Sequence, residues 1–457
     1  MRSKSGLRAA PKFLFAFVLL ATMTSAAYAP AAPVPPPAPA ALLWADPVNT
    51  NAIALSANGQ YVVVATPGGV SFYGRSSSTP LWTYSLSSFD YTSVAISADG
   101  SYVAAATFDP QFPQGRVLFW ADAKSLTTEP HNPGTPDPTW SSASLNGPLE
   151  RRCLAISADG NAVAACGTGP SVFYWAGATG RTTPNELTTW DYNFGFLVEA
   201  IAISPDGNYV AAVNSGGYVA YWKNAKSLTG RSGSQLPTWS GQEVGENLVD
   251  VAISNDGNYV AAAGGGGVSD TIYYWAGALT RSTQTESHTW SGGESVGFSS
   301  VDMSSSGDSV VAGAEDGVYF WSRARGLTGT PTQTWKYSTS NPAFDVAIDS
   351  AGDYMAACTA SFATLYFFDN TGSLKWGYEI DADKVSISSD GATLAAGTPG
   401  LRTAYLLSTG FPTHVPVGPV GGFMEPVNKL AAIAPYLALF GVMAVVAVAV
   451  ARKKQEN

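Results

Sequence analysis

Three histidines, three cysteines and one pair of closely spaced aspartates are the residues of this chain that could do metal or covalent chemistry. His131, His288 and His414 fall in loops or outside the repeats described below, and they share no metal-ligand spacing. Asp381 and Asp383 offer oxygen ligands for Ca²⁺, but two carboxylates alone do not make a site. The chain has neither a Gly-x-Ser-x-Gly nucleophile elbow nor a phosphate-binding glycine loop. The sequence therefore predicts a protein that is not an enzyme and binds no metal or cofactor.

The cysteines allow two interpretations. Cys166 and Cys358 each stand six residues after a repeated turn glycine, in a slot that mostly holds small residues elsewhere, so buried and unreactive thiols are expected. Cys153 lies on the strand before the turn, and a hairpin centred between Asp159 and Gly160 would set it opposite Cys166. A Cys153–Cys166 disulfide is the alternative, although a shift of register by one residue would separate the two side chains.

Binding is easier to predict than catalysis, from loop residues that vary between repeats as adaptable contacts do. The aromatic candidates are Phe89, Tyr91, Phe108, Phe112, Tyr192, Phe194, Phe196, Phe298 and Phe344. The charged candidates stand just before the first strand of a repeat, and they are Arg151, Arg152, Glu199, Asp250, Asp345, Asp383 and Lys384.

Eight copies of one sequence motif position these residues. Each copy is an apolar strand, a turn of the Ser-x-Asp-Gly type and a second strand related to Tyr-Val-Ala-Ala. The turn glycines are Gly59, Gly100, Gly160, Gly207, Gly257, Gly307, Gly352 and Gly391. A period of about 40–50 residues with several short strands per unit is typical of a β-propeller.

The strands after each turn complete a four-stranded blade. A third strand ends in aromatic residues and a fourth carries one Trp, and both are interpreted as packing between blades. The eighth copy has no Trp strand after it, whereas Leu42-Leu43-Trp44 stands alone before the first copy. We therefore predict an all-β, eight-bladed propeller in which the strand of Trp44 completes the last blade. Seven blades, with one copy packed outside the ring, is the alternative.

In such a ring the candidate residues share one rim and the mouth of the central channel. The long loops of the opposite rim repeat Leu-Thr, as at Leu126-Thr127 and Leu228-Thr229, and are interpreted as structural turns.

The repeats resemble those of WD-repeat and quinoprotein-like (PQQ-like) propellers over about 370 residues, from Leu42 to Ser408. The stretch from Asp369 to Trp376 is similar to the Asp-x-x-Gly-x-x-x-Trp phrase of PQQ-like repeats. The Trp-Asp dipeptide of WD repeats is missing, so their side-chain network is not carried over. The resemblance implies a membrane-anchored prokaryotic surface protein, with archaea the first expectation. It also leaves one alternative function, a quinone- or metal-dependent extracytoplasmic oxidoreductase.

The two ends of the chain predict its location. Basic residues, the apolar run 13–23 and small residues form a signal peptide over 1–29, with an uncleaved anchor as the alternative. A Pro/Ala-rich linker (30–41), the propeller (42–410) and a Gly/Pro linker (411–428) follow. An uncharged stretch makes 429–451 a transmembrane helix, and the basic cluster in 452–457 places that tail in the cytoplasm. The propeller is therefore expected outside the cell.

Charge narrows the class of partner. Removing both ends leaves 16 basic and 33 acidic residues in 30–428, a net charge near −17. Nucleic acid is an unsuitable partner, because binding it depends on Lys and Arg neutralising phosphates. We expect an interaction or envelope scaffold at the cell surface that binds protein or glycan, with self-association as a further prediction.

Overall fold

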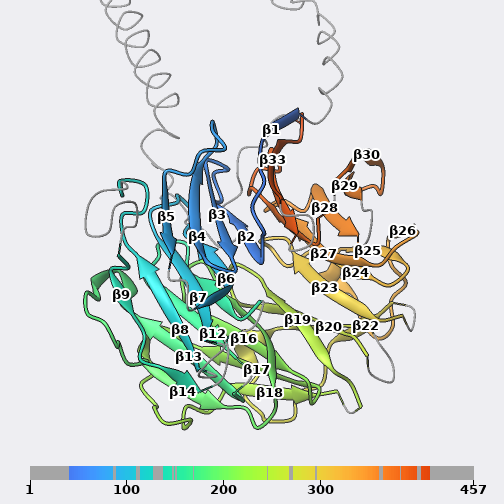
Figure 1. Ribbon diagram of the computed structural model, residues 1–457. Coiled ribbons are helices and arrows are strands. Elements are labelled where there is room, and N and C mark those ends of the chain that lie inside the picture. The colour runs from blue at the N-terminus through green and yellow to red at the C-terminus, as the bar shows by residue number, and fades with distance from the viewer. Residues whose placement is uncertain are drawn as a thin grey trace, which may run out of the picture. The chain divides into compact units, whose positions relative to one another are not determined.

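The computed structural model describes residues 41–411 except 86–88, 110–113, 127–136, 147–148, 150–151, 168, 244, 267–270, 294–295, 360–363, 381 and 399–402. In this part of the chain the strands form eight sheets that follow one another around a ring (Figure 1). The eight-bladed propeller is confirmed. The predicted signal peptide, transmembrane helix and cytoplasmic tail lie outside the described residues. Among the residues that are described, we find no helix with the length and apolarity to cross a bilayer.

The first four blades each begin with a strand at the channel and end with a strand at the periphery. Blade 1 is β2 (Ala52–Leu55), β3 (Tyr61–Thr66), β4 (Gly69–Gly74) and β5 (Trp82–Ser85). Blade 2 is β6 (Asp90–Ile96), β7 (Val103–Asp109) and β8 (Gln114–Trp120), bordered by β9 (Trp140–Ser141) and β10 (Leu145–Asn146). Blade 3 is β11 (Leu154–Ile156), β12 (Ala162–Cys166), β13 (Ser171–Ala176) and β14 (Trp190–Asn193). Blade 4 is β15 (Val198–Ile203), β16 (Tyr209–Asn214), β17 (Tyr218–Lys223) and β18 (Trp239–Gln242).

The remaining blades repeat this order, and the last one takes its outer strand from the start of the described chain. Blade 5 is β19 (Leu248–Ile253), β20 (Tyr259–Gly264), β21 (Ile272–Ala276) and β22 (Trp290–Gly292). Blade 6 is β23 (Phe298–Met303), β24 (Ser309–Ala314), β25 (Gly317–Ser322) and β26 (Trp335–Ser338). Blade 7 is β27 (Ala343–Ile348), β28 (Tyr354–Thr359), β29 (Thr364–Asp369) and β30 (Leu374–Glu379). Blade 8 is β31 (Lys384–Ile387), β32 (Thr393–Thr398), β33 (Thr403–Ser408) and β1 (Ala41–Asp46). Short 3-10 helices follow the third strands of blades 3 to 6, as η1 (Ala178–Gly180), η2 (Ala225–Ser227), η3 (Ala278–Thr280) and η4 (Ala324–Gly326).

The ring closes through β1, as the lone Trp44 strand predicted. β1 pairs antiparallel with β33 (Figure 1), and Trp44 lies opposite Leu406 in this pairing. The Trp44 ring then stacks on Tyr73 of blade 1 at 5.0 Å between centroids. One strand from the beginning of the propeller therefore completes the last sheet and packs against the first, which leaves no open seam between them.

The conformation of the Ser-x-Asp-Gly turn explains why this sequence motif recurs in the blades. All eight turn glycines have φ between 66° and 82°, the left-handed region that favours Gly. In blade 4, Ser204 Oγ donates to Asp206 Oδ1 at 2.6 Å and accepts from the Tyr209 backbone N–H at 3.0 Å. A Cβ on Gly257 would lie 2.2 Å from the Tyr209 ring. The glycine thus serves both the turn and the close approach of the preceding blade.

The repeated tryptophans hold neighbouring blades together. Trp190 stacks on Tyr174 of its own blade at 5.0 Å and contacts Trp222 of the next at 5.2 Å. Its indole N–H donates to the Ala225 carbonyl of that next blade at 2.9 Å. The equivalent indole bonds join Trp82 to Ala123, Trp140 to Ala178, Trp239 to Ala278, Trp290 to Ala324, Trp335 to Asn370 and Trp376 to Thr409. Interblade packing is therefore the role of these rings, as the sequence indicated.

Of the two interpretations of the cysteines, the structure has the disulfide. Cys153 and Cys166 are bonded, with their Cα atoms 4.6 Å apart. The Cys166 backbone N–H donates to the Cys153 carbonyl at 3.0 Å, so the two residues face each other across the hairpin. Cys358 is a buried free thiol, and burial raises its pKa well above the usual value, which keeps it unreactive.

Candidate functional site

The first strand of each blade has a free edge at the channel, and aspartates satisfy that edge in one part of the ring. Asp250 Oδ2 accepts the Val301 N–H of the next blade at 3.0 Å. Asp302 accepts the Ile348 N–H, and Asp345 the Val385 N–H, each also at 3.0 Å from one blade to the next. Blades 5, 6 and 7 are therefore each linked to the following blade by a carboxylate at the channel wall.

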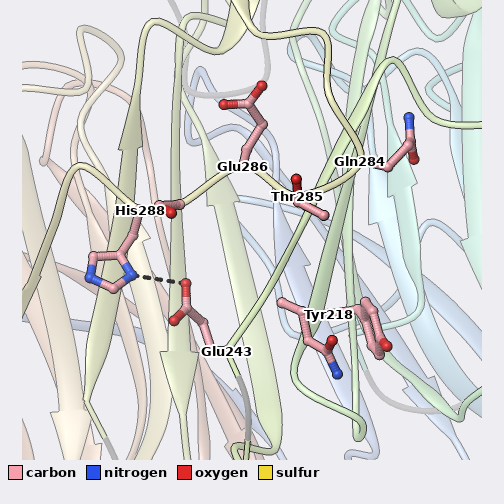
Figure 2. A pocket seen from close by; sticks show the side chains of 8 residues that line it. Tyr218, Glu243, Gln284, Thr285, Glu286 and His288 are labelled. Carbon is pink, nitrogen blue, oxygen red and sulfur yellow. Dashed lines mark hydrogen bonds and ion pairs between the residues drawn. The ribbon is translucent and has the colours of Figure 1, made fainter.

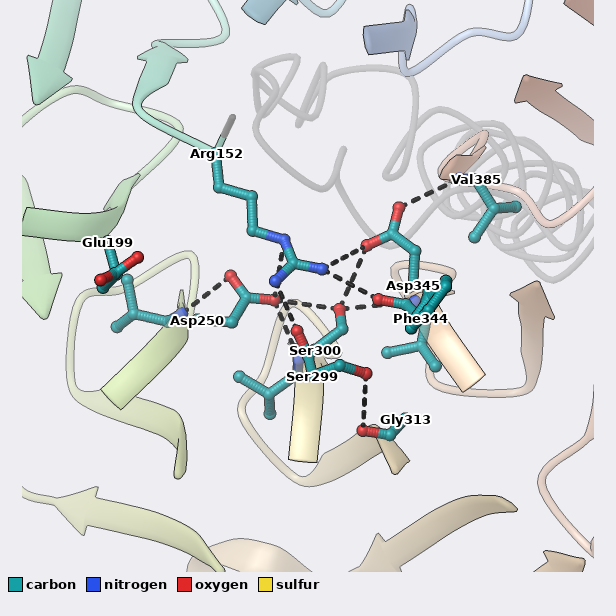
Figure 3. Close-up of polar contacts among 12 residues, drawn as sticks. Arg152, Glu199, Asp250, Ser299, Ser300, Gly313, Phe344, Asp345 and Val385 are labelled. Carbon is teal, nitrogen blue, oxygen red and sulfur yellow. Dashed lines mark hydrogen bonds and ion pairs between the residues drawn. The ribbon is translucent and has the colours of Figure 1, made fainter. Parts of the chain in front are cut away.

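The Arg152 side chain extends from blade 3 to the carboxylates of Asp250 and Asp345 (Figure 3). Its Nη2 donates to the Phe344 carbonyl at 3.0 Å and to Asp345 Oδ1 at 3.2 Å. Its Nε lies 3.7 Å from Asp250 Oδ2, and its Nη1 donates to the Ser299 carbonyl. One guanidinium thus joins blade 3 to blades 5, 6 and 7.

Burial and charge set opposite pKa shifts in this cluster. Burial raises the pKa of Asp250, and the neighbouring Arg152 cation only partly offsets that shift. For Arg152 burial acts to lower the pKa, but the charges of Asp250 and Asp345 outweigh it and the pKa is raised. Asp302 has no contact of this kind with Arg152, and burial raises its pKa to about 7. The guanidinium therefore stays charged and lies between two carboxylates, those of Asp250 and Asp345.

A cavity of about 570 Å³ adjoins this cluster through Arg152 and Ser299, and five of the predicted residues line it. It is lined by Arg152, Leu197, Glu199, Val249, Ser299, Phe344, Asp383 and Lys384. Phe344 is 41% exposed, so an aromatic ring stands among the charged groups. We call these eight residues the channel mouth. A second cavity of about 300 Å³, lined mainly by first-strand aliphatic residues and Asp302, also lies on the channel.

The other predicted residues do not gather at the channel mouth. Tyr91 and Phe298 are 0% and 2% exposed in cores between blades, and Phe194 is 9% exposed. Their rings offer no surface to a ligand in this state, because the apolar faces are used in packing. Phe89, Phe108 and Tyr192 are partly buried, and Phe112 lies outside the described residues.

A contact that the sequence did not predict lines a third cavity, of about 440 Å³, beside blades 4 and 5 (Figure 2). His288, which the sequence places outside any metal-ligand pattern, is half-buried there, and its Nδ1 lies 2.8 Å from Glu243 Oε1. The two residues belong to different blades, so no local spacing could indicate the pair. His131, His414 and Asp381 fall outside the described residues. In the described ranges no three His, Cys, Asp or Glu side chains are grouped to hold a metal.

Comparison with known proteins adds a structural likeness. No family model matches the sequence, and no curated protein matches it. Among solved structures, the C-terminal WD40 domain of Sif2 superposes with a TM-score of 0.61 at 12% identity, covering 82% of this chain and 99% of that domain. The chain has the fold of WD40-like propellers. BamB from Moraxella catarrhalis gives 0.54 at 14% identity, over 81% and 99% of the two chains.

A third similar structure is Chaetomium thermophilum Sqt1 bound to the N-terminus of the ribosomal protein L10. This WD40-like match has a TM-score of 0.60 at 16% identity and covers 79% of this chain and 96% of that one. At such identities the likeness concerns the fold alone. The residues of the channel mouth therefore have to be interpreted from their own chemistry.

Proposed function

We propose that this protein is a non-enzymatic interaction scaffold that binds a protein or glycan partner at the channel mouth. The observation that carries the proposal is the convergence of Arg152, Glu199, Phe344, Asp383 and Lys384 from several blades on one cavity. Aromatic and paired charged groups in a concave site are the combination that anchors a partner and fixes its orientation.

The charge balance favours a partner segment that carries positive charge. Among the described residues here, the four carboxylates of Glu199, Asp250, Asp345 and Asp383 stand near two cations, Arg152 and Lys384. An extended peptide with a basic side chain or a free amino terminus would complement this excess and could place an apolar residue on Phe344. The Sqt1 structure, in which a propeller of the same general fold holds a protein N-terminus, supports the proposal that such a segment binds here.

We place this scaffold on the outer face of the cell membrane, with the C-terminal tail in the cytoplasm. The predicted signal peptide and the uncharged stretch 430–451 in the sequence support this location. An outward-facing propeller would present its channel mouth to envelope or extracellular partners. A protease-protection assay on intact cells, with antibodies against the propeller and the tail, tests the orientation.

Cross-linking from the site tests the proposed function. A photoreactive amino acid in place of Phe344, activated on intact cells, should yield a discrete cross-linked partner. Lys384→Glu in the same protein should change the yield, because it reverses a charge in the cavity. The control places the photoreactive group at Phe196, which is 49% exposed but does not line the channel mouth. Equal products from both positions, or a yield insensitive to Lys384→Glu, would reject the channel mouth as the site.

A further inference from the structure

The peripheral strands of the blades differ in whether the chain covers them. In blade 4 the outer strand β18 is covered by the β21–β22 connection of blade 5: the Ser240 N–H donates to the Thr283 carbonyl at 3.1 Å, and the Glu286 N–H to the Ser240 carbonyl at 2.8 Å. Ser240 is only 9% exposed as a result. The same arrangement occurs on blades 2, 3 and 5, through Ser141 with Glu186, Asp191 with Gly230 and Ser291 with Gly329.

Blade 7 has no such cover within the described residues. Its outer strand β30, Leu374–Glu379, lies at the periphery of the ring (Figure 1). Gly377 follows Trp376 as Ser240 follows Trp239, so its N–H and carbonyl take the outward direction. Gly377 and Glu379 are exposed, and no described residue bonds to the outward side of their backbone. Open edges of this kind accept a further strand.

The sequence of β30 is complementary to itself. When two copies run antiparallel with Gly377 opposite Gly377, Lys375, which lies at a bulge in the pairing of β30 with β29, comes opposite Glu379 of the second copy. Trp376 then stands opposite Tyr378, and each pair occurs twice because the arrangement is two-fold symmetric. Opposite charges and paired aromatics are the cross-strand combinations that stabilise antiparallel sheets.

We infer that β30 is a self-association edge, through which two copies of this protein join their seventh blades into one continuous antiparallel sheet. The glycine on the two-fold axis places no side chain between the strands. Glu379 has no ion-pair partner among the described residues, so it is available to the second copy, and Lys375 would bridge Asp369 of its own chain and that Glu379. This surface lies outside the channel mouth, so the inference does not depend on the proposed function.

Charge-reversal variants test the pairing of the two β30 strands. The dimer constant of the full chain is measured by sedimentation equilibrium. Glu379→Lys replaces two attractive pairs with two repulsive ones. At about 0.5 kcal/mol for each attraction and each repulsion, it should weaken dimerisation about 30-fold. Glu315→Lys, the same change at an exposed rim residue of blade 6, should leave the dimer constant unchanged. A mixture of Glu379→Lys and Lys375→Glu proteins should restore association, because every cross-strand pair is again attractive.

Hydrogen exchange distinguishes a second copy from other occupants of the edge. The Gly377 and Glu379 amides should exchange more slowly as protein concentration rises, in step with dimer formation. A protein that stays monomeric up to about 1 mM overturns the inference. So does a dimer that Glu379→Lys does not weaken, or amide protection that is independent of concentration, since residues beyond 411 or a different partner would then cover β30. None of these results depends on cross-linking at Phe344.

Discussion

Replacing Arg152 with Met should destabilise the propeller strongly at neutral pH and only modestly in acid. The substitution keeps the aliphatic stem but removes the cation that lies beside Asp250 and Asp345. Removing one partner of a buried ion pair costs about 3–5 kcal/mol, because the remaining charge is buried without compensation. We expect a loss near 4 kcal/mol in the free energy of unfolding at pH 8.

The pH dependence follows from the sign of the Asp250 shift. Burial already raises its pKa in the folded protein, and loss of Arg152 removes the main opposing charge and raises it further. A carboxyl whose pKa is raised on folding costs stability as pH rises from its unfolded pKa through its folded one. In acid the protonated Asp250 needs no cation. The loss should then shrink to about 1–2 kcal/mol, the value of hydrogen bonds to the Ser299 and Phe344 carbonyls.

Urea unfolding at pH 5 and pH 8, followed by the fluorescence of the 13 tryptophans, measures both values. Arg231→Met is the matched control, because it removes an equal charge from an exposed loop residue and should cost under about 0.5 kcal/mol. Adding Asp250→Asn to the Arg152 variant should recover part of the loss at pH 8. Equal losses at the two pH values, or no recovery in the double variant, would refute a charge-based role for Arg152.

Four further outcomes are expected. The raised pKa of Asp302 lowers the free energy of unfolding as pH rises from about 4 to 7, and Asp302→Ala should remove that contribution. If urea unfolding shows the same pH dependence in the variant, Asp302 is not its source. Replacing Cys153 and Cys166 with Ala should cost about 2–3 kcal/mol and abolish the effect of reductant on urea midpoints, given the separation of 13 residues; a reductant effect that persists would count against the bond. Trp44→Ala should lower the free energy of unfolding by about 3–5 kcal/mol, because the closing strand β1 loses its one buried large side chain. A loss below about 1 kcal/mol in thermal or urea unfolding would mean that ring closure does not depend on this side chain. Truncation before Leu430 should yield soluble, folded propeller by gel filtration and circular dichroism, whereas aggregation would place 430–457 in the core.

The fold could be predicted in detail because its determinants are local and repeated. The turn glycine and its Ser and Asp neighbours recur with the same hydrogen bonds, so one blade indicates the others. The closing strand was also predictable, because a count of strands left Trp44 without a blade and the last blade without a Trp. These inferences need only the period of the repeat and the alternation of side chains along a strand.

The candidate site could be predicted in position but not in detail. The residues at or just before the start of the first strands face the channel, which was enough to name Arg152, Glu199 and Asp383, although Glu199 lies within β15 rather than before it. The reach of Arg152 from blade 3 to blade 7 depends on the width of the ring, which no spacing within a repeat reveals. The pair of Glu243 and His288 was missed for the same reason, since its two residues come from adjacent blades.

The electrostatic character of the channel mouth follows from a structural requirement of the propeller. The innermost strand of every blade has N–H groups that no fifth strand can satisfy. Asp250 and Asp345 of blades 5 and 7 accept such N–H groups from blades 6 and 8, which gathers negative charge on one side of the channel. Arg152 neutralises part of that charge, and Glu199, Asp383 and Lys384 line the same cavity. The groups that link the blades therefore also set the charge of the channel mouth, and the proposed preference for a positively charged partner segment rests on that charge.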